Sequence, residues 1–148
     1  MPAATTALAA CLVIASHTYS VPVPVMLGIL QVEGGRVGLE MRNRNGTHDL
    51  GPMQINTIWM PELARHWKTD VRTVRRWVRD DGCTNIHVGA WILRRKIHEA
   101  GNLSGGIARY HSGTPHLGRK YLGKVTRAMQ RLGLLASNQT GRTRSRRG

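Results

Sequence analysis

The sequence contains no phenylalanine and very few acidic residues. Its 148 residues include three Tyr, four Trp and only 8 Asp and Glu, against 22 Lys and Arg, so the formal net charge is +14. Apolar residues still make up 41% of the chain, which excludes a wholly disordered protein. This length suits one domain. We predict that the domain covers residues 1–135 and that residues 136–148 form a basic, disordered tail.

Long apolar runs and strand-like alternation are also missing. The spacing of apolar residues predicts successive helices and no credible sheet, so we expect an all-α fold. Pro22 and Pro24 separate a helix over 7–19 from one over 25–33. Asp70 is a good N-cap for a helix over 71–79. Further helices are expected over 55–67, from 83 or 84 to about 100, and over 106–110 and 117–134.

The amino-terminal segment is small and apolar but carries no Lys or Arg before its apolar stretch. It is therefore a poor signal peptide, and it is too short and weakly apolar to span a bilayer. We predict no transmembrane segment. The four tryptophans are expected to supply much of the large side-chain packing, with Trp77 and Trp91 on buried helix faces. Trp59 is expected either in the core or at the edge of a binding groove.

Glu33 closes the apolar run 25–32 and is followed by Gly34 and Gly35. A carboxyl group at the end of a largely buried helix is partly desolvated, and desolvation raises its pKa toward the range of a general acid. The alternative is an ordinary surface Glu in the last turn of a helix that Gly34 ends.

Three further segments follow Glu33 in order. They are Gly51-Pro52-Met53-Gln54-Ile55-Asn56, Asn85-Ile86-His87-Val88-Gly89-Ala90 and Ala108-Arg109-Tyr110-His111-Ser112-Gly113. Together with Glu33 they resemble the soluble lytic transglycosylase family of lysozyme-like enzymes. The likeness covers residues from about 11 to 121 and is strongest to small exported members that accompany conjugative and type IV secretion systems.

This resemblance implies a lysozyme-like domain with a groove for peptidoglycan glycan strands. The implied reaction cleaves the β-1,4 bond between N-acetylmuramic acid and N-acetylglucosamine and leaves a 1,6-anhydromuramyl end, with Glu33 as acid and then base. The residues implied in substrate binding are Gln54, Tyr110, Met53, Asn85 and His111. Met53 is expected beneath the groove, while Gln54 and Asn85 could instead be helix-start residues and Tyr110 a core residue. Two positions depart from the family pattern: Gly34 replaces a Ser and His111 an Asn.

Cys11 and Cys83 are the only cysteines. By themselves they could form a disulfide or remain two buried thiols. The resemblance implies a disulfide and hence export to the periplasm, although no clear signal peptide precedes it. The spacing of Cys and His suits no metal site, and no cofactor is predicted.

Two other functions remain open. In a hydrolytic muramidase, Asp49 or Glu40 would assist a water molecule. Alternatively, a non-catalytic basic adaptor would bind murein or DNA. Nucleic acid is not expected as the main ligand, because the basic residues are scattered and no platform of aromatic and basic residues appears. A secretion or conjugation machine is the expected partner.

Overall fold

The computed structural model describes residues 2–136, and the tail expected from 136 onward lies outside it apart from Ala136. The described chain forms seven α-helices, one short 3-10 helix and three very short strands. The helices are α1 (Pro2–Tyr19), α2 (Val23–Glu33), α3 (Met60–Trp67), α4 (Val71–Asp80), α5 (Gly82–Ala100), α6 (Leu103–His111) and α7 (Pro115–Arg131). None of these helices has the length and apolarity needed to cross a membrane.

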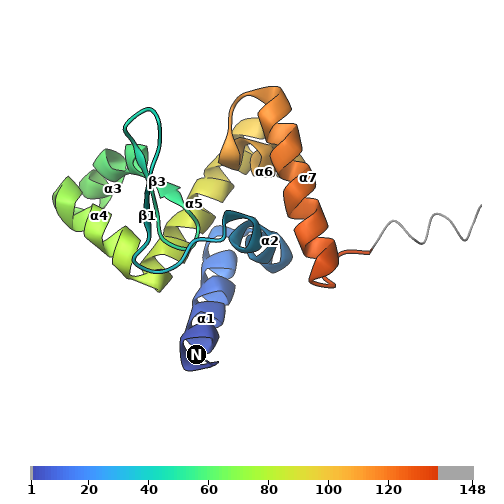
Figure 1. The fold of residues 1–148 in the computed structure, drawn as a ribbon, viewed down its shortest axis with the longest axis horizontal. Helices are drawn as coiled ribbons and strands as arrows, with labels where there is room; N and C mark the ends of the chain where they lie inside the picture. The colour runs from blue at the N-terminus through green and yellow to red at the C-terminus, as the bar shows by residue number, and fades with distance from the viewer. Residues whose placement is uncertain (1, 137–148) are drawn as a thin grey trace, which may run out of the picture.

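Helix α5 lies at the centre of the fold. It packs against α1, α4 and α6, while α7 packs against α2 and α6. Figure 1 shows the sheet, α3 and α4 on one side of α5, and α2, α6 and α7 on the other. The predicted mostly helical, lysozyme-like class is confirmed, and the two sides of α5 become the two sides of a groove.

The prediction that the chain contains no sheet is wrong. Strands β1 (Glu40–Arg42), β2 (His48–Leu50) and β3 (Ile55–Asn56) form an antiparallel sheet in the order β1-β2-β3. Its register pairs Glu40 with Leu50 and Asp49 with Asn56. Strands of two or three residues are too short to show an alternating pattern, so the sequence gives little sign of them. Side-chain hydrogen bonds within the loop support the sheet, including one from Asn56 Nδ2 to Asp49 Oδ1 at 3.1 Å.

The helix predicted over 55–67 is also shorter than expected. Residues 55 and 56 belong to β3, a 3-10 helix covers Thr57–Trp59, and only then does α3 begin. Asn56 caps the 3-10 helix, because its side-chain oxygen accepts a hydrogen bond from Ile58 N at 3.0 Å. The pairing of β3 with β2 therefore takes the residues that helix periodicity alone would assign to the helix.

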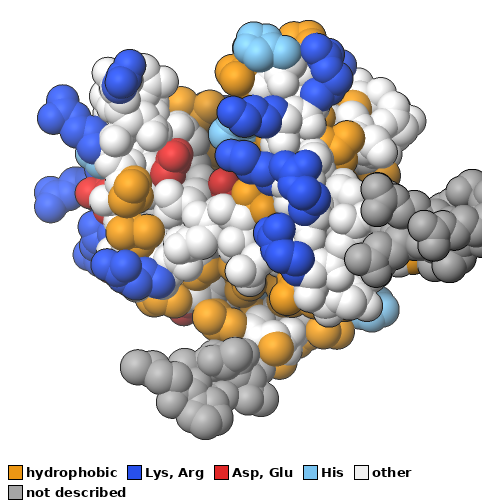
Figure 2. All heavy atoms as spheres, turned by 45° about the vertical axis from the view of Figure 1, so that its right-hand side comes forward, with side chains coloured by type: hydrophobic (Ala, Val, Ile, Leu, Met, Phe, Trp, Pro, Cys, Tyr) orange, Lys and Arg blue, Asp and Glu red, His pale blue; other side chains and the backbone are white. Residues whose placement is uncertain are grey.

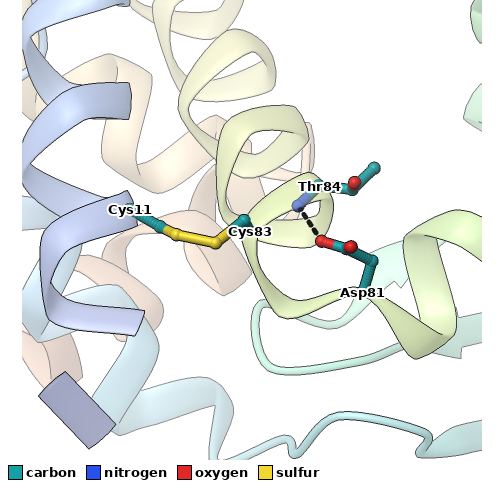
Figure 3. The surroundings of a disulfide bond; sticks show 4 residues. All are labelled: Cys11, Asp81, Cys83 and Thr84. Atoms are coloured by element: carbon teal, nitrogen blue, oxygen red, sulfur yellow. Dashed lines mark hydrogen bonds between the residues drawn. A yellow bond between two sulfur atoms is a disulfide. The ribbon is translucent and has the colours of Figure 1, made fainter. Parts of the chain in front are cut away.

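Aspartates cap the N-termini of α4 and α5. Asp70 Oδ1 accepts a hydrogen bond from Thr73 N at 2.7 Å, so the predicted N-cap of α4 is confirmed. Asp81 caps α5 in the same way through Thr84 N, at 2.9 Å (Figure 3). Two residues beyond Asp81, Cys83 forms a disulfide with Cys11 of α1, as predicted (Figure 3). Closing a loop of 72 residues stabilises the fold by about 4 kcal/mol in chain-entropy models.

The core consists of aliphatic and methionine side chains. The largest fully buried residues are Leu12, Met26, Ile29, Leu50, Met53, Ile55, Met60, Ile86, Leu93, Val74, Val78 and Val125. The expectation that Trp side chains supply much of the packing is wrong for two of the four, since Trp67 and Trp77 are 37% and 43% exposed. These two rings contact each other on α3 and α4, with centroids 6.0 Å apart. Trp59 and Trp91 are partly buried against the core.

Candidate active site

Glu33 is the last residue of α2 and sits where the helix meets the groove. Gly34 ends the helix as predicted: it adopts the left-handed conformation (φ 62°), and its N–H donates to the Leu30 carbonyl at 3.1 Å. Helix α2 is fixed against α7 at Gly28, where a side chain would meet Val125 and Met129. Close helix packing therefore determines where the Glu33 carboxyl group lies.

Two cavities meet at Glu33. One, of about 260 Å³, extends toward the sheet and is lined by Glu33, Asp49, Gln54, Ile55, Asn56, Trp59, Ile92, Tyr110 and His111. The other, of about 240 Å³, extends along α7 and is lined by Val32, Glu33, His111, Leu117, Lys120, Tyr121 and Lys124. Figure 2 shows acidic side chains in a hollow between two parts of the surface. The arrangement leaves space for a ligand on both sides of the carboxyl group.

The surroundings of Glu33 raise its pKa to about 7. Burial is the largest cause, and the negative charge of Asp49 adds to it, while the positive charge of Lys124 and the hydroxyl of Tyr121 lower the pKa. At neutral pH a large fraction of Glu33 is therefore protonated. A carboxylic acid in this state can donate a proton at the pH at which most proteins work.

The segment 51–54 is held against α5 by Asn85. The Asn85 amide donates to the carbonyls of Leu50 (2.8 Å) and Val78 (2.9 Å), and its oxygen accepts from Met53 N (2.8 Å). Asn85 is fully buried, so it offers no surface to a sugar, unlike the role in substrate binding that we expected. Gly51 makes this contact possible, because a Cβ there would overlap the Asn85 amide and its φ of 66° suits glycine.

Gln54 and Met53 are neighbours in this segment, but only Gln54 lines a cavity at Glu33. Gln54 lines the sheet-side cavity, and its Nε2 donates to the Gly51 carbonyl at 2.9 Å. Its backbone is left-handed (φ 52°), a conformation that costs a residue other than glycine about 1 kcal/mol or more and is enriched at functional sites. Met53 is fully buried and lines neither cavity at Glu33.

Two tyrosines, Tyr110 and Tyr121, lie near Glu33. The ring of Tyr110 lines the sheet-side cavity, but its hydroxyl donates to the Met53 carbonyl at 3.0 Å rather than to Glu33. Tyr121 on α7 was not among the site residues expected from the sequence. Within the described chain the buried Tyr121 hydroxyl has no partner at full hydrogen-bond geometry, yet it lies near enough to Glu33 to lower the pKa of that carboxyl.

Comparison with known proteins agrees with this geometry. The profile of the transglycosylase SLT domain matches residues 10–131, which include Glu33, the 51–54 segment and Tyr110. The chain belongs to the transglycosylase SLT domain family. It is similar to the invasion protein IagB of Salmonella typhimurium strains SL1344 and LT2, with 29% identity over 110 residues in each case. These residues are 74% of this chain and 66% of IagB, so the match spans just under two thirds of the relative's length.

Two positions of this SLT domain depart from the family pattern that the sequence suggested. Gly34 brings no side chain next to Glu33, and its left-handed backbone would strain most other residues there. His111 lines both cavities and stacks on Tyr121, with ring centroids 4.7 Å apart. Burial and the charge of Lys124 lower the His111 pKa. The imidazole is thus mainly neutral at pH 7, so it can donate and accept hydrogen bonds.

The two other carboxylates considered for catalysis, Glu40 and Asp49, differ in whether they line a cavity with Glu33. Glu40, which we considered as a second acid, is paired with Arg75 (2.8 Å) and lines neither cavity. Its pKa is lowered mainly by the hydrogen bond from Arg75. Only Asp49 shares a cavity with Glu33 among the described residues. The alternative of a second carboxylate therefore rests on Asp49 alone.

A third cavity of about 300 Å³ lies away from Glu33. Its lining consists of Tyr19, Leu63, His66, Trp67, His87, Val88 and Trp91. Its lining contains no carboxyl group that could protonate a glycosidic oxygen. Of these three cavities, only the two at Glu33 contain a carboxyl group.

Proposed function

We propose that this protein is a peptidoglycan lytic transglycosylase with Glu33 as its single acid and base. The observation that carries this proposal is the raised pKa of Glu33, at about 7, at the junction of two cavities. A carboxyl group in this position meets the requirement for protonating the bond between two sugars bound on either side of it. Membership of the SLT family supplies the substrate class.

In the proposed reaction, Glu33 donates its proton to the oxygen between muramyl C1 and the N-acetylglucosamine residue. The C1–oxygen bond breaks, and the sugar leaves with a hydroxyl group. The C6 hydroxyl of the same muramic acid then attacks C1, and the Glu33 carboxylate takes up the hydroxyl proton. A 1,6-anhydromuramyl end forms, no water is consumed, and Glu33 is protonated again.

The walls of the sheet-side cavity fit such a ligand. Gln54, Asn56 and His111 bring amide and imidazole groups to it, and Trp59 and Tyr110 bring rings. Sugars present hydroxyl and acetamido groups to such donors and acceptors. The Tyr110 hydroxyl donates its hydrogen bond to the Met53 carbonyl, so in this proposal Tyr110 shapes the cavity with its ring.

A second function, hydrolysis to a reducing end, is favoured by one observation. Asp49 lines the cavity with Glu33 and is near enough to raise its pKa. A carboxylate on that side could activate a water molecule. The hydrogen bond from Asn56 to Asp49 argues for a positioning role of Asp49 instead.

The compartment and the role are inferred from the disulfide and from the relatives. The Cys11–Cys83 disulfide is typical of proteins in oxidising compartments, and peptidoglycan lies in such a compartment, so we infer that the protein acts in the periplasm. The relatives are named as invasion proteins. We infer local wall opening for an envelope apparatus as the role.

Digestion of purified sacculi by the wild type and by Glu33→Gln tests the proposal. Because a general acid contributes about 10²- to 10⁴-fold to a rate, we expect the variant to lose at least that factor. Mass spectrometry should find anhydro ends, without added water, in the wild-type digest. Glu99→Gln, an exposed Glu on α5, is the matched control and should keep full activity. Unchanged activity in Glu33→Gln would refute the catalytic assignment, and reducing ends would favour the hydrolase.

A further inference from the structure

The second cavity has a cationic wall that the proposed chemistry does not use. Lys120 and Lys124 line it together with Glu33. They continue along α7 into Arg127 and Arg131, and all four side chains are exposed. Spacings of four, three and four residues place them on one face of the helix, over about 16 Å. We call these four residues the α7 stripe.

The α7 stripe has no anionic partners within the described chain. Each ion pair among residues 2–136 involves Arg75, Arg79, Arg95 or Lys96 as the cation. Basic residues beside the sheet are therefore partly neutralised, whereas those on α7 are not. Figure 2 shows a column of Lys and Arg side chains beside the hollow that contains acidic ones. A row of unmatched cations at the edge of a cavity favours an anionic ligand there.

The charge of this stripe acts inside the groove. Lys124 is near enough to Glu33 and to His111 to lower the pKa of both. The sheet-side cavity instead carries Asp49 and no Lys or Arg. A ligand that occupies both cavities therefore has one part beside Asp49 and the other part beside Lys120 and Lys124. Anionic groups of such a ligand are favoured in the cavity along α7.

We propose that the α7 stripe binds the carboxylate groups of the peptide stems carried by the muramyl residues of the glycan strand. This inference rests on the proposed function and adds a substrate preference to it. In an intact strand the lactyl carboxyl group of each muramyl residue is joined to its stem by an amide bond, so the free carboxylates of the strand belong to the stems and match the charge of the stripe. Flexible Lys and Arg side chains suit carboxylates at the end of a mobile peptide. The protein would then prefer strands that carry stems over bare glycan.

Binding can be measured without turnover in the Glu33→Gln background. The probes are glycan strands with their peptide stems and the same strands after an amidase has removed the stems, which leaves one lactyl carboxylate on each muramyl residue, close to the sugar ring. An exposed ion pair is worth about a two- to fivefold change in affinity, so we expect stem-bearing strands to bind about tenfold more tightly at low salt. Salt should reduce this preference, because exposed charges are screened.

Arg127→Gln combined with Arg131→Gln should reduce the preference and leave binding of stem-free strands almost unchanged, because neither residue lines a cavity at Glu33. Lys120 and Lys124 are left in place because both line the cavity with Glu33, and the charge of Lys124 acts on Glu33. The charge-conserving pair Arg127→Lys and Arg131→Lys should keep the preference. Arg72→Gln with Arg76→Gln, on the exposed face of α4, removes the same charge elsewhere and should have no such effect.

Several outcomes would overturn the proposal. Equal affinity for the two strands would do so, as would an equal loss for both in the stripe variant or the same loss in the α4 control. Tighter binding of duplex DNA than of stem-bearing strands at the same salt would assign the stripe to nucleic acid. A wild type that binds stems but releases no anhydro ends would refute the proposed function alone. A wild type that releases anhydro ends equally from both strands would refute only the stem preference.

Discussion

The groove at Glu33 has two walls, and each is held together by different forces. The sheet wall, formed by Asp49, Gln54, Asn56 and Trp59, depends on side-chain hydrogen bonds and on the buried amide of Asn85 behind it. The α7 wall, formed by Lys120, Tyr121 and Lys124, depends on the packing of α7 against α2 and α6 and on the stacking of His111 on Tyr121. One wall is organised by polar contacts and the other by packing.

The walls also act on Glu33 with opposite signs. Asp49 on the sheet wall raises the pKa of Glu33, and Lys124 and Tyr121 on the α7 wall lower it. Burial is larger than either effect and brings the pKa to about 7. Burial at the end of α2 thus makes Glu33 a weak acid, while the charges of the two walls adjust its pKa in opposite directions.

The largest expected effect is on the sheet wall, from Asn85→Ala. This change removes a hydrogen bond from each of three groups, the Met53 N–H and the carbonyls of Leu50 and Val78. Each unsatisfied buried group costs about 1–3 kcal/mol, so the free energy of unfolding should fall by about 3 to 5 kcal/mol. Urea denaturation measures this loss.

Two variants provide the contrast for Asn85→Ala. Asn102→Ala removes an exposed N-cap from α6 and should cost only about 1 kcal/mol. On the α7 wall, Tyr121→Phe removes a hydroxyl that lacks a well-formed partner, so stability should change by less than about 1 kcal/mol. A loss from Tyr121→Phe as large as that from Asn85→Ala would contradict the difference between the walls.

The next effect concerns the burial of Glu33. Its pKa is raised from 4.5 to about 7 in the folded protein, so the fold disfavours the charged form. As pH rises from about 4.5 through about 7, the unfolded chain gives up this proton first, and the stability contributed by the neutral acid is lost. The loss should be on the order of 2 to 3 kcal/mol for this group. Urea denaturation at pH 5 and pH 8 measures it.

Glu33→Gln is the control for that pH dependence. A neutral amide cannot titrate, so the difference between pH 5 and pH 8 should shrink by the same amount in this variant. An unchanged difference would mean that other groups cause the pH dependence and that Glu33 has an ordinary pKa.

The smallest expected effects come from the charges on the two walls. Because the acid must be protonated to begin the reaction, kcat/KM should decline as pH rises through the Glu33 pKa. Asp49→Asn removes a negative neighbour, which should lower that pKa and move the decline to lower pH. Lys124→Gln should raise the pKa and move the decline to higher pH. Rate profiles for anhydro product release between pH 4 and pH 9 measure both shifts.

Opposite shifts would confirm that the walls adjust Glu33 from two sides. Shifts of the same sign would mean that Asp49 and Lys124 do not act on the Glu33 pKa in opposite directions. Asp49→Asn also tests the hydrolase alternative: a loss of activity at every pH would mean that Asp49 has a chemical role beyond its charge.

Helix periodicity and end signals predicted most of the fold because they depend on neighbouring residues. Asp70 caps α4 and Gly34 ends α2 through contacts within a few residues of each. The sheet could not be predicted in this way, because β1, β2 and β3 depend on pairing across a loop. The exposure of Trp67 and Trp77 was missed for the same reason, since packing partners from other helices decide which face is buried.

Within the site, the motifs identified Glu33, Gln54, Tyr110 and His111 as cavity residues, but not the direction of each side chain. Asn85 was expected at the ligand surface, and the structure places it behind that surface. Tyr121 and Lys124 were missed because nothing in α7 distinguishes them from its other buried and basic positions. Their relation to Glu33 exists only where α7 crosses the end of α2.

The sequence by itself determined that Glu33 ends an apolar helix, that Cys11 and Cys83 could form a disulfide, and that the ordered motifs belong to one family. These are properties of local chemistry and spacing along the chain. Only the tertiary structure decided the protonation of Glu33 and the charge of each wall. Desolvation and Coulomb interactions depend on distances through space, and those distances arise from the packing of α2 against α1 and α7 and from the position of the sheet across the groove.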